Sequence, residues 1–424
     1  MSDARPLKIL LYSLNYAPEL TGVGKYSGEM AEWLAARGHE VRVVCGPPYY
    51  PRWRVSQGYR WWWYTKERIA GVSVWRCPVW VPRRPGGLTR LLHLFSFVLS
   101  STPSLIRHAF WRPDVVLAME PPFMGAPSAL LAARLAKARS WLHVQDLEVD
   151  AAFALGLLRP GWMSRLAFGL EQRIKRLFSG ISTISAAMAA RLQEKLEAPV
   201  PPAVFPNWVD TETIRPMESP SPLRGELGID DSTVVALYAG NMGGKQGLEL
   251  IVSAARRLVD MPQLVFVLCG EGVAADRLRE ETREMANVRW LPLQPFERLN
   301  DLLNLADIHL LPQRADAADL VMPSKLTGMM ASGRPVVATA HEEAEVGRVV
   351  TGAGRVTSPG NEQAFAEAIV ELASERQLRE RLGQAARRHA QDHWETNRVL
   401  GRLQDTLSSL VHPKVVRQER RGTD

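Results

Sequence analysis

Short apolar runs alternate with amphipathic stretches along the first half of the chain. The run at residues 9–14, Ile-Leu-Leu-Tyr-Ser-Leu, is typical of a buried strand, and a later stretch places Met30, Trp33 and Leu34 on one side of a helix. Parallel strands need a long crossover, usually a helix, so this alternation predicts a parallel sheet covered on both faces. The predicted strands are residues 9–14, 41–45, 72–76, 115–119, 141–145, 180–184 and 203–205, and the main predicted helices are 28–37, 125–138 and 162–178.

The second half repeats the alternation after a proline-rich stretch at residues 199–222. We therefore expect an α/β fold of two doubly wound, Rossmann-like domains, whose parallel sheets face a ligand cleft. A charged helical region at residues 375–410 and a polar basic tail at 412–424, predicted to be disordered, close the chain. The predicted strands are residues 234–239, 264–269, 288–291, 308–311 and 335–338, and the helices are 248–259, 274–285, 296–303, 323–331 and 364–372.

The composition fits two domains. With 424 residues, of which 46% are hydrophobic, the chain exceeds the size of one ordinary core. Its three cysteines, Cys45, Cys77 and Cys269, include no close pair, which argues against a disulfide framework or a zinc site and favours a reducing cytosol. The chain shows neither a charged-then-apolar leader nor an uncharged apolar stretch of about 18 residues, so neither secretion nor a membrane span is expected.

A glycine turn carrying one lysine follows the predicted strand at residues 234–239. It reads Gly-Asn-Met-Gly-Gly-Lys-Gln-Gly at residues 240–247, immediately before a predicted helix. Glycines let the backbone approach an anion, N–H groups at a helix start donate to it, and Lys245 adds positive charge, so we expect a diphosphate here. The expected donor contacts around this turn and the next strand end are Asn241, Gly243, Lys245 and Gly270.

A second glycine turn lies near the amino terminus. Thr-Gly-Val-Gly-Lys at residues 21–25, with Gly22 and Gly24, follows the first predicted strand, and the two glycine turns together suggest two facing sheets with a ligand between them. Neither turn matches a diagnostic fingerprint: this one lacks the third glycine of the dinucleotide motif, and the other lacks the Gly-Lys-Ser/Thr ending of a nucleoside triphosphatase loop. Each turn alone is also compatible with an ordinary strand-to-helix connection.

A third anion site is predicted where Pro-Ser-Lys-Leu, at residues 323–326, opens a helix. Proline at a first helical turn with Ser324 and Lys325 beside it places donors and a cation at a helix start. Lys245 and Lys325 would then hold one diphosphate between them. The alternative interpretation is two exposed lysines on unrelated loops.

The end of the predicted strand at residues 141–145 carries His143 and Asp146. Side chains alternate between the faces of a strand, so these two can share a site only if the strand ends between them. Strand ends in such sheets border the ligand cleft. His143 is also readable as a structural histidine, and Asp146 is the better candidate for a charge in the cleft.

No Asp-x-Asp pair is present to hold a metal ion against phosphate groups. The charge of a diphosphate would then be neutralised by helix ends and lysines. We therefore expect neither a metal requirement nor another cofactor.

One segment is both strongly basic and rich in tryptophan. Residues 49–112 contain eleven Lys and Arg against a single acid, Glu67, and seven of the 13 tryptophans. They also contain an apolar run at residues 91–106, interrupted by serines and Pro103. Basic charge with interfacial aromatic residues is typical of a surface that rests on anionic lipid. Core or acceptor-site packing and nucleic-acid binding are the alternatives, but no nucleic-acid module is recognisable and we expect no such partner.

Several motifs resemble the retaining glycosyltransferases of family 4, which have the GT-B fold. Their order and spacing match over nearly the whole chain, and the closest likeness is to the colanic-acid type of exopolysaccharide fucosyltransferases. The motifs are Asn-Tyr-Ala-Pro-Glu-Leu-Thr-Gly-Val-Gly-Lys-Tyr-Ser from Asn15, Gly-Pro-Pro-Tyr-Tyr-Pro from Gly46, Val-Phe-Pro-Asn-Trp-Val-Asp from Val204, the turn at 240–247, Ala-Asp-Ile-His-Leu-Leu-Pro from Ala306, Pro-Ser-Lys-Leu from Pro323 and Ser-Gly-Arg-Pro-Val-Val from Ser332.

The resemblance implies a nucleoside-diphosphate sugar donor in the C-terminal domain, with Lys245, Ser324 and Lys325 near the diphosphate and Leu293-Gln294 near the base. A lipid-linked or oligosaccharide acceptor would bind the N-terminal domain, and the sugar would move with retention, with GDP-fucose as one candidate donor. The implied location is the cytoplasm, peripheral to the inner face of the cell membrane. The predicted parts are an acceptor domain at residues 1–205, a linker at 206–222, a donor domain at 223–388, and a helix crossing back with a basic tail at 389–424.

The chain departs from the family pattern at two places. The usual Glu-x7-Glu positions are Leu320 and Gly328, and the basic residue of the Gly-Arg turn is Asn241. The acceptor-side histidine of the family corresponds to His143 or to Gln145 beside Asp146, and we favour Asp146 as the functional residue. The missing glutamates leave two other functions open: a non-catalytic, nucleotide-sugar-binding scaffold of a polysaccharide assembly, and a nucleotide-sugar epimerase.

Overall fold

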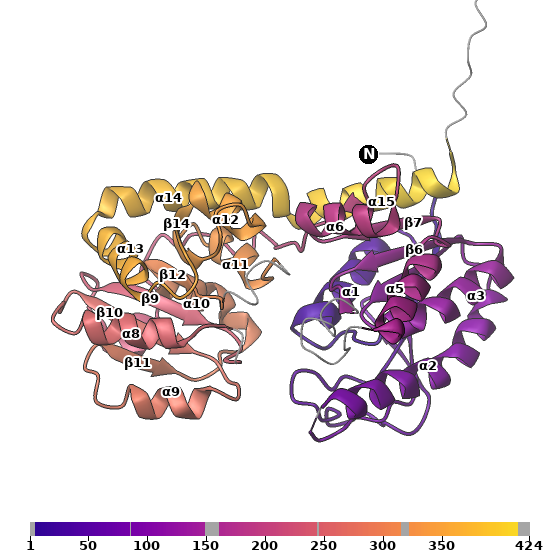
Figure 1. Ribbon diagram of the computed structural model, residues 1–424, viewed down its shortest axis with the longest axis horizontal. Coiled ribbons are helices and arrows are strands. Elements are labelled where there is room, and N and C mark those ends of the chain that lie inside the picture. Colours follow the sequence, from indigo (N-terminus) through magenta and orange to yellow (C-terminus); the bar gives the residue numbers. More distant parts are fainter. Residues whose placement is uncertain (1–4, 85, 149–160, 244–245, 315–321, 414–424) are drawn as a thin grey trace, which may run out of the picture. The chain divides into compact units, whose positions relative to one another are not determined.

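The computed structural model describes residues 5–84, 86–148, 161–243, 246–314 and 322–413, and these form two compact units (Figure 1). The first unit comprises Met1–Ile184, Ala189–Phe205 and Leu400–Asp424, and the second comprises Ser185–Met188 and Pro206–Val399. Each unit contains one sheet, with helices connecting its strands.

The first unit contains an eight-stranded sheet of order β3-β4-β2-β1-β5-β6-β7-β8, parallel except at one edge. All six residues of β5 are buried, as expected for a parallel strand covered on both faces. The strand β3, which the sequence pattern did not predict, pairs antiparallel with β4. The strands are β1 (Lys8–Tyr12), β2 (Glu40–Cys45), β3 (Thr65–Ile69), β4 (Val72–Arg76), β5 (Val115–Glu120), β6 (Arg139–Val144), β7 (Gly180–Thr183) and β8 (Ala203–Val204).

The helices of the first unit connect these strands and include one long helix absent from the prediction. The apolar run interrupted by serines and Pro103 forms α2, a single helix of 23 residues. The hydroxyl of Thr102 donates to the carbonyl of Val98, so the polar residues satisfy their hydrogen bonds within the helix. The helices are α1 (Gly22–Ala36), α2 (Gly87–Ala109), η1 (Phe123–Gly125), α3 (Ala126–Ala136), α5 (Trp162–Lys175) and α6 (Ala186–Leu196).

The second unit contains a fully parallel, six-stranded sheet of order β11-β10-β9-β12-β13-β14. The predicted strands are present, and β14 is additional. The strands are β9 (Val234–Ala239), β10 (Leu264–Cys269), β11 (Val288–Leu291), β12 (Ile308–Leu311), β13 (Val336–Thr339) and β14 (Gly354–Thr357). The helices are α7 (Leu223–Glu226), α8 (Glu249–Arg257), α9 (Ala275–Glu281), η2 (Phe296–Arg298), α10 (Leu299–Leu305), α11 (Lys325–Ala331), α12 (Glu345–Thr351), α13 (Glu362–Ser374) and α14 (Arg376–His389).

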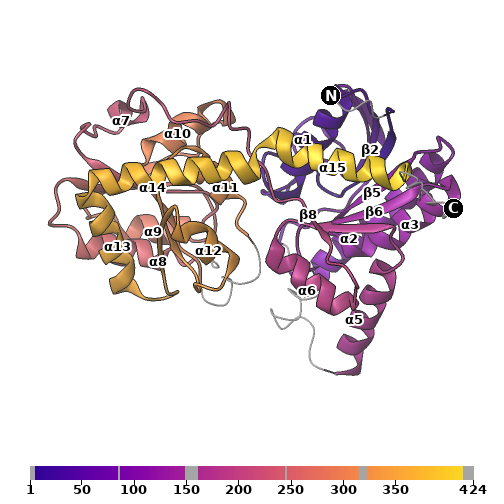
Figure 2. The ribbon, with the colours of Figure 1, turned by 90° about the horizontal axis from the view of Figure 1, so that it is seen from above.

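The charged C-terminal region forms two helices joined by a π-helical turn. These are α14, the turn η3 (Ala390–Trp394) and α15 (Thr396–Val411) (Figures 1 and 2). Helix α14 packs in the second unit against α11, whereas α15 belongs to the first unit from Leu400 onward. There the side chain of Gln404 lies close to His39, whose Nδ1 accepts from the backbone N–H of Leu7 at 3.0 Å.

Candidate functional site

The strand order of each sheet locates the place where a ligand is expected to bind. In the second unit β9 lies between β10 and β12, so the chain runs from β9 through β10 to β11 on one side and then crosses to β12 on the other. Strand β1 has the same position between β2 and β5 in the first unit. In doubly wound sheets, ligands bind outside the carboxyl ends of the strands at such a switch point. The two glycine turns predicted from the sequence follow these strands, with Gly240 after β9 and Gly22 after β1.

The turns after β9 and β10 are joined backbone to backbone. The N–H of Gly240 donates to the carbonyl of Cys269 at 2.9 Å, and the N–H of Met242 donates to that of Glu271 at 2.8 Å. Gly270 has a φ of +155°, and a Cβ added there would lie 2.0 Å from the Gly240 carbonyl oxygen. Gly270 was predicted to contact the donor, and the structure gives it a packing reason: a side chain would force the two turns apart.

Lys325 and Tyr238 form the charged centre of this switch point. Lys325 is the first residue of α11. Its Nζ lies 4.2 Å from the centre of the Tyr238 ring and donates to the Tyr238 hydroxyl at 3.2 Å. That hydroxyl donates in turn to the Asn241 carbonyl at 2.6 Å. Beside them, a Cβ at Gly240 would lie 3.6 Å from Cδ of Lys325, so the lysine packs against the glycine turn.

No carboxylate among the described residues pairs with Lys325. Burial lowers the pKa of its ammonium group to about 7, with no opposing charge to restore it. A partly buried cation that lacks a counter-ion favours an anionic ligand, and perturbed groups of this kind cluster at functional sites. Tyr238 was absent from our prediction; the available signal was a tyrosine on a buried strand next to a glycine turn, since a buried hydroxyl needs a partner.

The rest of the glycine turn presents amide groups. Asn241 is exposed, and a Cβ at Gly243 would approach Oε1 of Gln246 to 2.9 Å and Nδ2 of Asn241 to 3.2 Å. The Oε1 atom of Gln246 is buried and has no hydrogen-bond partner among the described residues. Gln246 was not predicted, although it lies in the quoted motif. Lys245, which we expected to hold the diphosphate, lies outside the described residues, as does Leu320.

The remaining predicted donor contacts lie at the carboxyl ends of the same sheet. Ser324 immediately precedes α11, is exposed, and makes no side-chain capping hydrogen bond. Leu293 and Gln294 follow β11, two strands away from β9, and the Leu293 side chain is 55% exposed. The Gln294 amide donates to the Pro292 carbonyl at 2.8 Å, so it folds back on its own loop. The structure thus gathers Asn241, Gly243 and Lys325 and leaves the Leu293-Gln294 turn near the sheet edge.

The glycine turn of the first unit is held by a buried glutamate. Helix α1 starts at Gly22, earlier than predicted, and a Cβ at Gly24 would lie 2.5 Å from Oε2 of Glu19. The other oxygen of Glu19 accepts from the N–H groups of Tyr49 and Tyr50, at 2.8 and 2.9 Å. Gly24 therefore makes room for Glu19, whereas Gly22, with a φ of +57°, is exposed at the turn.

His143 is a buried, neutral residue within β6. Its Nδ1 lies 2.9 Å from the Ser182 hydroxyl, which also accepts from the indole N–H of Trp141 at 2.8 Å. Its Nε2 is buried without a partner among the described residues. Burial lowers the pKa of His143 to about 4, so the ring carries no charge at neutral pH.

Asp146 follows the end of β6, and its role as a charge in the ligand cleft stays a prediction. Strand β6 ends at Val144, so His143 and Asp146 are separated by the strand end, and Asp146 is partly buried while His143 is fully buried. Glu148 lies nearby: its carboxylate accepts from the Phe123 N–H at 2.8 Å. Burial raises the pKa of Glu148, and the charge of Asp146 acts in the same direction.

A buried ionic network lies at the end of β5 and was not predicted. Glu120, the last residue of β5, pairs with Lys175 at 2.9 Å, and Lys175 also pairs with Glu171 at 2.8 Å. Lys195 pairs with the second oxygen of Glu171. Burial raises the pKa of Glu120 to about 7, although Lys175 opposes the shift. The available signals were a charge ending an apolar strand and the i,i+4 spacing of Glu171 and Lys175.

Two family models together match most of the chain. The Glycosyl transferase 4-like domain matches residues 21–208, and Glycosyl transferases group 1 matches residues 221–389. The chain is also 43% identical over 350 residues to the putative colanic acid biosynthesis glycosyl transferase WcaI of Escherichia coli K12, covering 81% of this chain and 86% of that protein.

Two solved structures share the arrangement of strands and helices. Sucrose-phosphate synthase from Thermosynechococcus elongatus aligns with a TM-score of 0.73 at 16% identity, covering 95% of this chain and 99% of that chain. Anabaena HepE, solved in complex with UDP and glucose, aligns with a TM-score of 0.66 at 18% identity, covering 95% of this chain and 100% of that chain. At these identities the similarity concerns the fold.

Proposed function

This chain belongs to the family 4 glycosyltransferases of the GT-B fold, and on that premise we propose that it transfers a sugar from a nucleoside diphosphate to a lipid-linked or saccharide acceptor. The reaction would serve the synthesis of a colanic acid-like exopolysaccharide, as the name of the Escherichia coli relative states for that protein. We propose GDP-fucose as the first donor to test, on the resemblance to exopolysaccharide fucosyltransferases.

The observation that carries the proposal is the uncompensated cation at the β9 switch point. Lys325 lies over Tyr238 with no carboxylate partner among the described residues, at the carboxyl edge where nucleotides bind in doubly wound sheets. A diphosphate would supply the missing negative charge and raise the pKa of Lys325 back toward its ordinary range. Ser324, the turn at residues 240–247 and Gly270 would surround it, and the Leu293-Gln294 turn would approach the base.

The proposed chemistry is a substitution at the anomeric carbon with retention. The bond between that carbon and the diphosphate oxygen breaks, and its electron pair goes to the leaving diphosphate, where Lys325 and Lys245 stabilise the charge. The acceptor hydroxyl attacks from the same face, so its proton lies beside the departing oxygen and passes to it. We propose that lysines and backbone donors suffice for this role, so that the transfer needs no metal ion.

In the first unit we propose Asp146 as the functional carboxylate and keep His143 second. Asp146 lies just beyond the strand end and is partly exposed, so it can reach an acceptor hydroxyl. His143 is buried and neutral, which suits an uncharged positioning role. Gly22 and Gly24 are proposed to present their backbone to the donor phosphates. We assign the acceptor to residues 1–205 and the donor to 223–388, with 206–222 as linker and 389–424 as the returning helix and tail.

We further propose that the first unit docks on an anionic membrane from the cytoplasmic side. The four tryptophans at 61–63 and 80 are between 41% and 58% exposed, which disfavours the core interpretation for them. The loop is tied to α2 because the Tyr64 hydroxyl donates to the Ser100 carbonyl at 2.8 Å. No helix in the described part is long and apolar enough to cross a bilayer. The α2 surface, as we name it, comprises Trp61, Trp62, Trp63, Tyr64, Trp80, Leu88, Leu91, Leu92, Phe95 and Leu99 with Arg83, Arg84 and Arg90.

The proposed function is tested by binding and then by transfer. Thermal shifts are measured with GDP-, UDP-, dTDP- and ADP-sugars for the wild type and for Lys325→Ala; one nucleotide is expected to raise Tm, and the shift should vanish in the variant. The stabilising sugar nucleotide, radiolabelled in the sugar, is then incubated with an extracted lipid-linked acceptor fraction. Label moving to the lipid phase supports the enzyme.

The alternatives give different results in the same experiments. A scaffold would bind the nucleotide sugar and leave the label in place, whereas an epimerase would convert the sugar without any acceptor. Absence of a thermal shift with all four donors, with and without acceptor and anionic vesicles, would contradict the donor site itself.

A further inference from the structure

A basic pocket of the second unit lies at the amino-terminal ends of the strands, whereas the glycine turns lie at their carboxyl ends. It is lined by residues at the starts of strands: Asp307 directly precedes β12, Pro335 directly precedes β13, and Ser232 lies two residues before β9. This pocket and the Lys325 site therefore lie at opposite ends of the strands of one sheet. Its volume is about 650 Å³, within the usual range for small-molecule sites.

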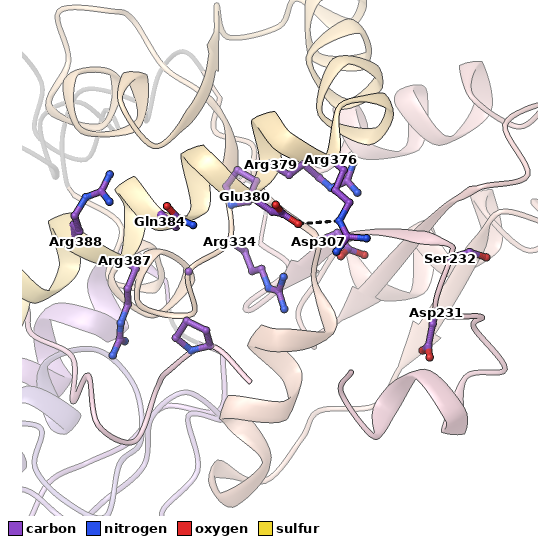
Figure 3. A pocket seen from close by; sticks show the side chains of 13 residues that line it. Asp231, Ser232, Asp307, Arg334, Arg376, Arg379, Glu380, Gln384, Arg387 and Arg388 are labelled. Carbon is purple, nitrogen blue, oxygen red and sulfur yellow. Dashed lines mark hydrogen bonds and ion pairs between the residues drawn. The ribbon is translucent and has the colours of Figure 1, made fainter. Parts of the chain in front are cut away.

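One face of α14 forms the other wall (Figure 3). Helix spacings of three and four residues place its polar side chains on the same side. The helix lies close because a Cβ at Gly383 would approach the Gly333 carbonyl oxygen to 2.2 Å, so only a glycine permits this contact. The α14 residues that line the pocket are Arg376, Arg379, Glu380, Gln384, Arg387 and Arg388.

Two of these arginines have structural roles. Arg387 donates to the carbonyl groups of Thr211, Ile214 and Ala331 at 2.6 to 2.7 Å, which fixes the helix to the unit. Arg379 donates to two carbonyl groups at the end of α13, at 2.6 and 2.8 Å. The fold therefore accounts for these two side chains without a ligand.

Arg334 is different, because the fold gives it no partner. Its Nε is buried without a hydrogen-bond partner among the described residues, and its guanidinium group forms no ion pair there, although Asp307 attracts it at longer range. The acid at the same edge, Asp307, is already engaged by Arg224 at 2.6 Å and by the N–H of Val235 at 2.9 Å. Burial lowers the pKa of Arg334, as expected for a desolvated cation. At the rim, Arg376 pairs with Glu380 of its own helix at 2.8 Å, and its side chain is 83% exposed.

We propose that this pocket binds a sugar phosphate. A guanidinium group recognises phosphate through paired N–H donors. Arg334 and the exposed Arg388 pair with no described residue, and Arg376 donates to Glu380 through Nε, which leaves its terminal N–H groups available. The three acids that line the pocket would repel a long polyphosphate, but their oxygens accept hydrogen bonds from sugar hydroxyls, as do Ser232 and Gln384. The pocket thus suits one phosphate group attached to a polyhydroxylated body.

The site is distinct from the proposed donor site. Helix α11 begins at Lys325 on the donor edge and ends at Ala331, three residues before Arg334, so a helix about 10 Å long separates the two. The proposal therefore does not depend on glycosyl transfer, and it can be tested in a protein whose donor site has been disabled.

The test is calorimetric titration of full-length Lys325→Met protein with glucose 1-phosphate, and with free glucose for comparison. We expect saturable binding of glucose 1-phosphate and none of glucose. Arg334→Gln in the same background should weaken binding about tenfold or more, and Arg376→Gln should weaken it less. The matched control is Arg381→Gln, an exposed α14 arginine outside the pocket, which should leave affinity within about twofold.

Two results would overturn the proposal. One is the absence of saturable binding to Lys325→Met protein while the wild type binds, because the anion then occupies the donor site. The other is an equal loss of affinity in Arg334→Gln and Arg381→Gln, which would indicate general attraction to a basic helix. Because Arg334 is partly buried, circular dichroism of each variant verifies folding, and the exposed Arg376→Gln variant gives an independent reading if Arg334→Gln is unstable.

Discussion

The ammonium group of Lys325 lies 4.2 Å from the centre of the Tyr238 ring and donates to its hydroxyl at 3.2 Å. The two residues are 87 positions apart in the chain and meet because α11 begins at the carboxyl edge of β9. A neutral ring and hydroxyl cannot cancel the charge of the lysine, so the pair leaves the site cationic and poorly solvated. The unpaired charge of Lys325 therefore destabilises the free protein, and an anion that binds there would relieve this destabilisation.

That cost predicts a more stable protein when the lysine is removed. Lys325 ionises near pH 7 when folded and near its ordinary 10.5 when unfolded. Between these values the unfolded chain binds more protons, so stability rises with pH. Lys325→Met has no such group and should exceed the wild type by on the order of 1–3 kcal/mol at pH 7. Denaturant unfolding at pH 7 and 9 measures the free energy of unfolding of both proteins. The difference between them should shrink from pH 7 to pH 9, and a difference that grows with pH would contradict the prediction.

The same pKa predicts how donor affinity depends on pH. Only the protonated lysine attracts the diphosphate, so affinity for the matching sugar nucleotide should be constant below about pH 7. It should then fall as the pH rises, by at most tenfold per pH unit. Lys325→Arg stays charged throughout this range and should give a flat profile. Calorimetric titrations from pH 6 to 9 measure both proteins, and parallel declines would assign the effect to another group.

Replacement of Asp146 is predicted to lower the transfer rate, whereas replacement of His143 is predicted to change the stability in acid. Asp146→Asn should lower kcat about a hundredfold or more and shift Tm little, because the side chain is partly exposed and proposed to act on the acceptor. His143→Gln should chiefly change stability in acid. The buried ring has a pKa of about 4 against 6.5 when unfolded, so the wild type loses stability as the pH falls from about 6.5 toward 4.

The measurements are transfer rates at neutral pH and thermal unfolding from pH 4 to 7. His143→Gln should show a shallower loss of Tm in acid while keeping the neutral pH–rate profile of the wild type. A hundredfold loss of kcat in His143→Gln with an unaltered Tm would reverse our ranking of the two residues.

The sequence predicted the strands well for a physical reason. Parallel strands covered on both faces can be apolar along their whole length, and β10 was visible in the sequence as such an uninterrupted run. The polar edge strand β3, Thr-Lys-Glu-Arg-Ile, carries no such signal. Helix α2 was missed because Pro103 and the serines resemble a break in a helix. The hydroxyls of Ser100, Ser101 and Thr102 instead donate to carbonyl groups of the preceding turn of the same helix.

The site was only partly visible in the sequence. Glycines and lysines at strand ends indicated an anion, and Lys325 lies where this predicted. Tyr238 could not be assigned from local patterns, since its role depends on which strand α11 lies against. Glu120 and Lys175 are 55 residues apart in the chain, and they meet because β5, β6 and β7 lie side by side in the sheet, which no local sequence pattern indicates. Donor and acceptor identity depend on a few pocket contacts that no single motif encodes.

The Glu120–Lys175 pair should be costly to break from one side. Both side chains are fully buried, so Lys175→Met would leave Glu120 unpaired and should destabilise the protein by about 3–5 kcal/mol. The double variant Glu120→Gln with Lys175→Met should recover much of that loss, because Glu171 retains Lys195. For comparison, Arg298→Met breaks the more exposed pair with Glu226, at 2.6 Å, and should change the stability far less than Lys175→Met does.

Denaturant unfolding of the four proteins measures these differences. Equal destabilisation in Lys175→Met and Arg298→Met would mean that the buried network is hydrated in solution. A double variant less stable than Lys175→Met alone would mean that Glu120 has another partner.

The α2 surface predicts a membrane interaction in which charge and apolar contact are separable. Arg83 and Arg84 are exposed beside the exposed tryptophans, and each basic residue near an anionic surface contributes about 1 kcal/mol. Arg83→Glu with Arg84→Glu should therefore weaken binding to phosphatidylglycerol vesicles tenfold or more, and added salt should weaken wild-type binding in the same direction.

Apolar contact should be lost separately in Trp62→Ser with Trp63→Ser, whose residual binding should stay salt-sensitive because the arginines remain. The matched control is Arg256→Glu with Arg257→Glu, which reverses two exposed charges on α8 of the other unit. Sedimentation with phosphatidylglycerol and phosphatidylcholine vesicles measures all four proteins. Equal losses of vesicle binding in the two charge-reversal variants would mean that only net charge matters. Undiminished binding in the Arg83 and Arg84 variant would mean that the membrane contact lies elsewhere, and the exposed tryptophans would then be assigned to the acceptor.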